Sequence, residues 1–134
     1  MKHSRWRGLI PASILATSLL TACNGASTGV CTEVFAIATV TVVDSVSAPA
    51  ATATVTTTLL RTGETLTPTS VMDFVTGVYP ILDDGAVPKL RIAGDSIRVR
   101  AVQGAAAAEA VYRFEVPGGC HIERVSGPDT LVVR

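Results

Sequence analysis

Residues 51–61 alternate strictly between two sets of side chains, and this alternation constrains the fold more than any other feature of the chain. Successive side chains of a β-strand point to opposite faces, so a period of two predicts a strand with one buried face. The expected inward set is Ala51, Ala53, Val55, Thr57 and Leu59, and the outward set is Thr52, Thr54, Thr56 and Thr58. The alternative for a segment so rich in Thr and Ala is a disordered stalk. The regular alternation favours the strand.

The rest of the chain after residue 30 consists of short β-rich runs separated by turn signals. Strands are predicted at residues 33–44, 77–82, 90–93, 96–103, 105–116, 120–124 and 130–133, where β-branched and aromatic residues are concentrated. Turns are predicted at 45–50, 63–69, Asp83-Asp84-Gly85, Gly94-Asp95, Pro117-Gly118-Gly119 and Gly127-Pro128, from their Gly, Pro and Asp residues. Because no segment favours a stable helix, residues 31–134 are expected to form an all-β fold, a single antiparallel sandwich of about seven strands.

Two of these strands also predict which side chains enter the core. In residues 96–103 the expected inward residues are Ile97, Val99 and Ala101, with Arg98 and Arg100 outward. In residues 105–116 the inward set is Ala108, Ala110, Tyr112, Phe114 and Val116, with Glu109, Arg113 and Glu115 outward. This pattern is typical of a sheet with one face packed against a core and one face in water.

The N-terminus has the parts of an export signal. Lys2, Arg5 and Arg7 supply positive charge, and residues 9–20 form a mostly apolar run. A run of about a dozen residues suits the apolar core of a signal peptide and is shorter than the roughly 20 residues of a membrane-spanning helix. We therefore expect residues 1–22 to form a signal helix that is removed on export. The alternatives are an ordinary secretory signal, which would leave Cys23 as a free thiol, and a retained membrane anchor.

The four residues that end this run, Leu20-Thr21-Ala22-Cys23, resemble the lipobox of bacterial lipoproteins. The resemblance implies that Cys23 carries acyl chains such as palmitate and becomes the first residue of an extracytoplasmic, membrane-anchored protein. Asn24 stands where the family's inner-membrane retention signal usually has Asp, which favours the outer membrane in a cell that has one. Residues 23–30 then form a tether, of which residues 24–30 span at most about 25 Å.

Charge excludes some partners. The whole chain has 11 basic and 11 acidic residues, and loss of residues 1–22 removes three of the basic ones. The mature part therefore has a net charge of about −3, without the concentrated basic face of nucleic-acid binders and without a polybasic segment for anionic lipids. We expect no nucleic-acid partner.

The chain has three cysteines, and the lipoprotein resemblance decides how they are used. If Cys23 is lipidated, Cys31 and Cys120 remain to form a disulfide in an oxidising compartment. Such a bond would close a loop of nearly 90 residues, for which the chain-entropy model gives about 4 to 5 kcal/mol. The alternative is two separate thiols, since the sequence does not show that their backbones come within reach.

A second resemblance concerns the first two strands. Val40-Thr41-Val42-Val43-Asp44, Pro49 and Ala53-Thr54-Val55 resemble the opening of carboxypeptidase regulatory-like domains. The family has glycine where this chain has Ala48 and Thr52. The resemblance implies a transthyretin-like sandwich, related in architecture to the immunoglobulin-like ones, that acts as a non-catalytic accessory or interaction module.

The residues that could carry chemistry favour the same conclusion. His121 is the one histidine after residue 22, and no nucleophile-elbow motif accompanies it, so a structural role is expected. Asp83 and Asp84 lack the spacing of a calcium loop and are expected in a turn, and Glu109 and Glu115 are expected as solvated charges. The sequence thus predicts no enzyme, no cofactor and no metal, but a module that binds an envelope protein through a surface or a strand edge. The alternative is a lipoprotein that binds a small ligand or a glycan.

Overall fold

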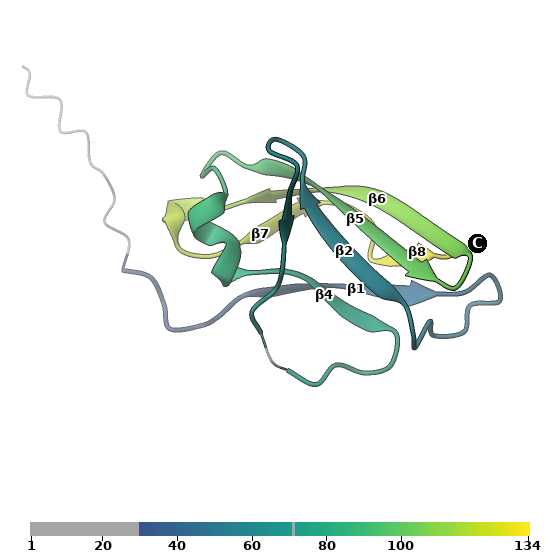
Figure 1. The fold of residues 1–134 in the computed structure, drawn as a ribbon. Coiled ribbons are helices and arrows are strands. Elements are labelled where there is room, and N and C mark those ends of the chain that lie inside the picture. The colour runs from purple at the N-terminus through teal and green to yellow at the C-terminus, as the bar shows by residue number, and fades with distance from the viewer. Residues whose placement is uncertain (1–29, 71) are drawn as a thin grey trace, which may run out of the picture.

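A computed structural model describes residues 30–70 and 72–134, which form a two-layer β-sandwich (Figure 1). The predicted signal helix, the lipobox and most of the tether lie outside these residues. The strands are β1 (Ile37–Val43), β2 (Thr54–Leu59), β3 (Glu64–Leu66), β4 (Val78–Asp83), β5 (Asp95–Gln103), β6 (Ala106–Glu115), β7 (Glu123–Ser126) and β8 (Thr130–Val132). Two short 3₁₀ helices, η1 (Asp84–Lys89) and η2 (Pro117–Gly119), connect them. The all-β sandwich predicted from the sequence is confirmed.

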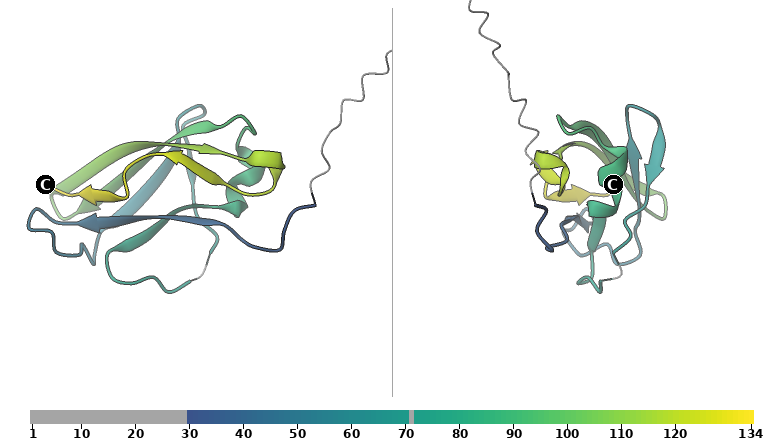
Figure 2. Two further views of the ribbon diagram at one scale, coloured as in Figure 1. Left: turned by 180° about the vertical axis from the view of Figure 1, so that it is seen from behind. Right: turned by 90° about the vertical axis from the view of Figure 1, so that its left-hand side faces the viewer.

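The smaller sheet has the strand order β4-β1-β8, and the larger has β3-β2-β5-β6-β7. All pairs are antiparallel except β1 and β8, which are parallel over Thr41–Val43. The exception arises because the chain leaves the larger sheet after β7 and crosses to the edge of the smaller one (Figure 2). The direction of β8 is therefore set by this crossing and not by a hairpin with β1.

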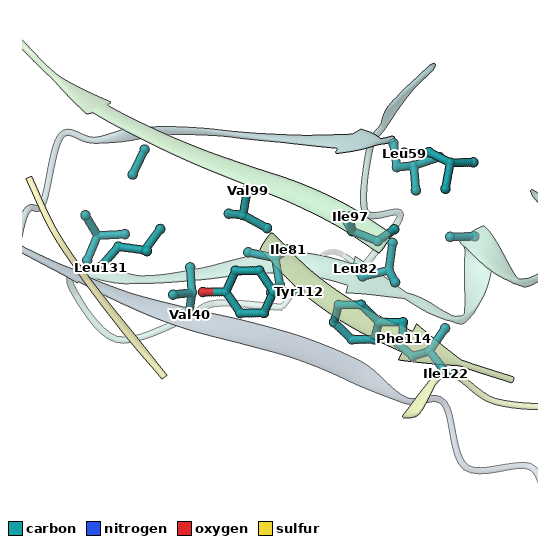
Figure 3. Close-up of a cluster of buried hydrophobic side chains, with 14 of the residues drawn as sticks. Val40, Leu59, Ile81, Leu82, Ile97, Val99, Tyr112, Phe114, Ile122 and Leu131 are labelled. Carbon is teal, nitrogen blue, oxygen red and sulfur yellow. The ribbon is translucent and has the colours of Figure 1, made fainter. Parts of the chain in front are cut away.

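The core lies between the sheets, and inward residues predicted for β5 and β6 are among its members (Figure 3). Ile97, Val99 and Ala101 are fully buried while Arg98 and Arg100 are exposed. Tyr112 and Phe114 are also fully buried, and their rings stack with centroids 6.4 Å apart. Burial of such aromatic side chains contributes much of the stability of a small core.

A glycine lets the crossing chain pass over this core. Gly127 has φ of 127°, and a Cβ there would lie 2.1 Å from Cδ1 of Tyr112. Only glycine permits both the backbone conformation and the close approach. The path of the chain from β7 to β8 thus depends on a residue without a side chain.

One buried carboxylate fixes the end of the sandwich where β5 begins. Asp95 is fully buried, and its Oδ1 accepts hydrogen bonds from Nε of Arg61 at 3.0 Å and Nε of Arg91 at 2.9 Å. Burial raises the pKa of Asp95, but the hydrogen bonds from Arg61, from the Arg91 N–H and from the Arg91 side chain outweigh it and hold the pKa below its usual range. The charge is therefore compensated by two arginines from neighbouring loops.

Several predicted boundaries are wrong, and the structure forms different elements at these positions. Residues 90–93 form a loop, since the N–H of Arg91 donates to Asp95. The strand predicted at 33–44 begins at Ile37, and the one predicted at 120–124 begins at Glu123. The turn predicted at 63–69 contains β3, whose three residues pair with the end of β2. The Asp83-Asp84-Gly85 turn continues into η1, with Asp83 as its N-cap.

Candidate functional site

The disulfide predicted from the sequence is present and defines one end of the sandwich. Cys31 and Cys120 are bonded, with their Cα atoms 5.3 Å apart. The bond fastens the segment before β1 to the connection between β6 and β7, next to η2. The chain therefore enters the domain at a covalently fixed point.

Asp84 joins three segments close to this disulfide. Its Oδ2 accepts the N–H of Ala36 at 2.8 Å, and its Oδ1 accepts the N–H of Ile122 at 2.9 Å. Nδ1 of His121 lies 2.7 Å from the same Oδ2. Burial raises the pKa of Asp84, but these hydrogen bonds from Ala36, His121 and Ile122 outweigh it, so the pKa lies below its ordinary value. The ionised carboxylate thus ties the start of β1 to the chain that leads into β7.

His121 stands between Asp84 and a hydroxyl group. Its Nε2 lies 3.0 Å from Oγ1 of Thr32, so hydroxyl, imidazole and carboxylate follow one another as they do in nucleophilic hydrolases. Thr32, however, is exposed on an irregular segment, and neither Thr32 nor His121 lines the groove described below. Since both oxygens of Asp84 also accept backbone N–H groups, these contacts hold the segment before β1 in place.

The edge of β1 that faces away from β4 is only partly covered. β8 pairs with Thr41–Val43 and does not reach the first half of β1. The N–H of Thr41 donates to the carbonyl of Asp129, which shows that the odd-numbered residues of β1 direct their backbone groups to this edge. By the same alternation the N–H and C=O groups of Ile37 and Thr39 point to the uncovered part, and no partner for them occurs among residues 30–70 and 72–134. The strand here offers two donors and two acceptors.

A groove lies along this uncovered edge, between the two sheets. Its volume is about 270 Å³, and it is lined by Ala36, Ile37, Ala38, Thr39, Phe114, Ile122 and Arg124. Phe114 and Ile122 lie side by side at one end of the core (Figure 3). One wall is therefore the backbone and small side chains of β1, and the other is apolar. The groove is the candidate functional site.

Arg124 is the charged residue of the groove lining, and it is already paired. Its guanidinium donates to the carboxylate of Asp129, whose side chain is 83% exposed. A pair so accessible to water is weak and easily exchanged. Arg124 therefore balances the charge of Asp129 and gives the groove little net charge.

The other predicted candidates lie apart from the groove. Oδ2 of Asp83 accepts the N–H groups of Thr69 and Ser70, at 2.5 and 2.8 Å, so this carboxylate stabilises a loop. Glu109 and Glu115 pair with Arg98 and Arg113 at 3.2 and 3.4 Å on the outer face, as solvated charges. In the described part of the chain, no cluster of three or more His, Cys, Asp or Glu residues is arranged to hold a metal ion.

The predicted lipidation site, Cys23, lies outside the described residues, so lipidation stays a prediction. Within residues 30–70 and 72–134, no helix has the length and hydropathy needed to cross a bilayer.

Sequence reasoning missed the groove and the role of Asp84. The groove exists because β8 covers only the second half of β1, and no local pattern gives the register between two strands that lie about 90 residues apart. The role of Asp84 depends on N–H groups of residues 36 and 122. The available signal was the pair Asp83-Asp84 directly after an apolar strand, which indicates carboxylates at the end of a sheet.

Loss of the disulfide should destabilise the fold. We expect Cys120→Ser, and the double variant with Cys31→Ser, to melt several degrees below the wild type without reductant, since the bond closes a loop with a sequence separation of 89 and each kcal/mol shifts a small domain by about 4–8 °C. Thermal melts followed by circular dichroism measure this. Excess reductant should bring wild type and double variant together, and equal melting points without it would refute the structural bond.

The lowered pKa of Asp84 predicts a pH-dependent contribution to stability. The ionised carboxylate stabilises the fold above the ordinary Asp pKa of about 3.9, and this contribution is lost as the pH falls through the lower pKa of the folded state. In urea titrations, Asp84→Asn should therefore be less stable than wild type near neutral pH, and the difference should shrink in acid. The control Glu109→Gln removes an exposed carboxylate and should have little effect. A gap between Asp84→Asn and wild type that stays constant down to about pH 3 would contradict the assignment.

No protein-family model matches the chain, and neither a curated protein nor a solved structure matches it.

Proposed function

We propose that the mature protein is a lipid-anchored, extracytoplasmic β-sandwich that serves as a non-catalytic accessory or protein-interaction module of the cell envelope. The basic and apolar N-terminus and the sequence Leu20-Thr21-Ala22-Cys23 support the anchor. The Cys31–Cys120 bond supports a compartment in which disulfides persist. Photo-crosslinking followed by mass spectrometry would identify the envelope protein that it binds.

The observation that carries the interaction function is the uncovered edge of β1. Ile37 and Thr39 leave backbone donors and acceptors without partners beside a groove, whereas soluble proteins usually cover, shorten or charge such edges. An uncovered edge next to an apolar wall is the arrangement on which strand-addition recognition depends. The groove therefore supports binding of another polypeptide.

The resemblance to carboxypeptidase regulatory-like domains supports the same function. Its residues lie in the first two strands and the connection between them: Val40–Val43 are in β1, Thr54 and Val55 are in β2, and Asp44, Pro49 and Ala53 lie between the strands. The resembling residues of β1 directly follow Ile37 and Thr39, which form the uncovered edge.

The alternative, a small-ligand or glycan binder, has less support. The groove of about 270 Å³ is slightly smaller than the 300 to 1,000 Å³ of typical small-molecule pockets. Within the described part of the chain, Phe114 is the single aromatic residue of the lining, and it is fully buried. A glycan site normally offers an exposed aromatic ring, so the groove fits a polypeptide better.

The anchor can be tested by blocking its maturation. Globomycin inhibits the peptidase that cleaves lipoprotein precursors, so cells that express the full chain should accumulate a larger precursor under the drug. The same treatment of Cys23→Ser, which lacks the acceptor thiol, should leave its band pattern unchanged. Immunoblotting of membrane fractions measures both, and normal processing of the wild type under globomycin would count against the lipobox.

The interaction can be tested by photo-crosslinking in intact cells. A benzophenone amino acid is placed at Thr39 on the uncovered edge, at Thr56 on the outer face of the larger sheet, or at Ile92 in an exposed loop. An interaction module should give a discrete adduct with an envelope protein from at least one position, identified by mass spectrometry. Absence of an adduct from all three positions would overturn the proposed function.

A further inference from the structure

We infer that the groove is a receptor for an extended peptide segment, which adds to the smaller sheet beside the first half of β1 and inserts an apolar side chain between the two sheets. This inference rests on the proposed interaction function and specifies its binding mode. The expected occupant is a peptide whose backbone is extended and whose side chains alternate between the two faces.

The chain already places a strand, β8, on this edge of β1. β8 runs along the same side of β1, where the N–H of Thr41 donates to Asp129 at 2.9 Å and the C=O of Val43 accepts the N–H of Val133 at 2.9 Å. An incoming strand beside Ile37 and Thr39 would lengthen the layer that β8 begins. The local backbone therefore has the geometry for pairing, and the uncovered part lacks the neighbour.

The uncovered backbone groups of β1 match those of another extended chain. Ile37 and Thr39 present N–H and C=O groups in alternation along one edge, at the spacing of a strand. Residues i and i+2 of a strand, such as Ile37 and Thr39, are about 6.6–6.8 Å apart. The backbone of another extended chain has the same spacing. A compact small molecule would satisfy one of these residues and leave the other with water. The pattern therefore selects a peptide.

The groove behind this edge has room for a side chain. Ala38 of β1 and Ala36, directly before β1, pack toward the core here, and both side chains are small. Phe114 and Ile122 form the opposite, apolar wall. A peptide residue that faces inward beside Ala38 would direct its side chain into the groove toward Ile122, while its two neighbours would face outward. The ring of Phe114 belongs to the lining but is itself fully buried. The preferred segment thus has one aliphatic or aromatic residue between two residues of any polar kind.

The groove imposes little selection by charge. Arg124, at its border, is balanced by Asp129, and no other ionisable residue among those that the structure describes lines the groove. Sequence preference should therefore come from the inserted apolar side chain, and affinity from backbone hydrogen bonds.

The experiment starts from a random peptide library displayed on phage and selected on the full chain in mild detergent. Recovered peptides should share an apolar residue with polar neighbours and should avoid proline in the paired segment. A synthetic copy of one recovered peptide then serves as the probe. Methylation of the peptide N–H groups that face β1 should weaken its binding about tenfold each, the equivalent of one lost hydrogen bond. Methylation of the intervening N–H groups should have little effect.

Two proline variants form a matched pair on the protein. Thr39→Pro removes an N–H that faces the groove, and Thr65→Pro removes one that faces outward on β3, the edge strand of the larger sheet. Proline is tolerated at such edge positions. Thr39→Pro should weaken the probe peptide at least about tenfold, and Thr65→Pro should leave it unchanged. Hydrogen exchange of the Ile37 and Thr39 amides should slow when the probe binds, which a non-specific apolar contact would not cause.

Three results would overturn the inference: no peptide recovered, equal effects of the two proline variants, or unchanged exchange at Ile37 and Thr39. A fourth is concentration-dependent dimerisation, abolished by Thr39→Pro, because it would make a second copy of the chain the occupant. If Thr39→Pro does not fold, the peptide methylation series on the wild-type protein decides. If the peptide tests fail while cross-linked adducts form at Thr56 or Ile92, the interaction function stands and the edge does not serve it.

Discussion

One carboxylate, that of Asp84, sets the spacing on which the candidate site depends. Its two oxygens accept the N–H groups of Ala36 and Ile122, and these two residues belong to opposite walls of the groove. A single rigid group therefore separates the start of β1 from the chain that enters β7. Because each N–H donates to a charged acceptor, the hydrogen bonds are of the stronger kind. Ala36 on one wall and Ile122 on the other are each hydrogen-bonded to Asp84, and this carboxylate between them keeps the two walls apart.

The disulfide and His121 reinforce this arrangement from outside. The Cys31–Cys120 bond precedes Ala36 by five positions on one side and Ile122 by two on the other, so it closes the same junction covalently. His121 adds a contact to Asp84 and one to Thr32. This end of the domain is therefore held by a disulfide and by the hydrogen bonds of Asp84, which help to keep the backbone of Ile37 and Thr39 extended although β4 pairs with it on one side only.

The sequence predicts those parts of the fold that depend on local patterns. Period-two alternation places Ile97, Val99 and Ala101 inward on β5, and the structure agrees because both β5 and its neighbours share one buried face. The cysteine count, once Cys23 is assigned to lipid, predicts the observed bond. Neither inference requires knowledge of which strands become neighbours.

The parts that depend on individual side-chain contacts or on long-range register were not predictable. Residues 90–93 resemble a strand, but the buried charge of Asp95 takes up the N–H of Arg91 and forms a loop. β3 has three residues, too few for a period to be recognised. The uncovered edge is a mismatch in length between β1, with seven residues, and β8, with three. Such a mismatch becomes visible when the register of the pair is known.

The parallel pairing of β1 with β8 also determines the order in which the domain can be completed. Among the described strands, β1 comes first along the chain and β8 comes last, and they join through contacts between residues about 90 positions apart. Contacts between such distant residues form slowly, because a long loop must close first. The described part of the smaller sheet therefore stays incomplete until β8 (Thr130–Val132) has been synthesised, because β8 forms the edge of that sheet beside β1.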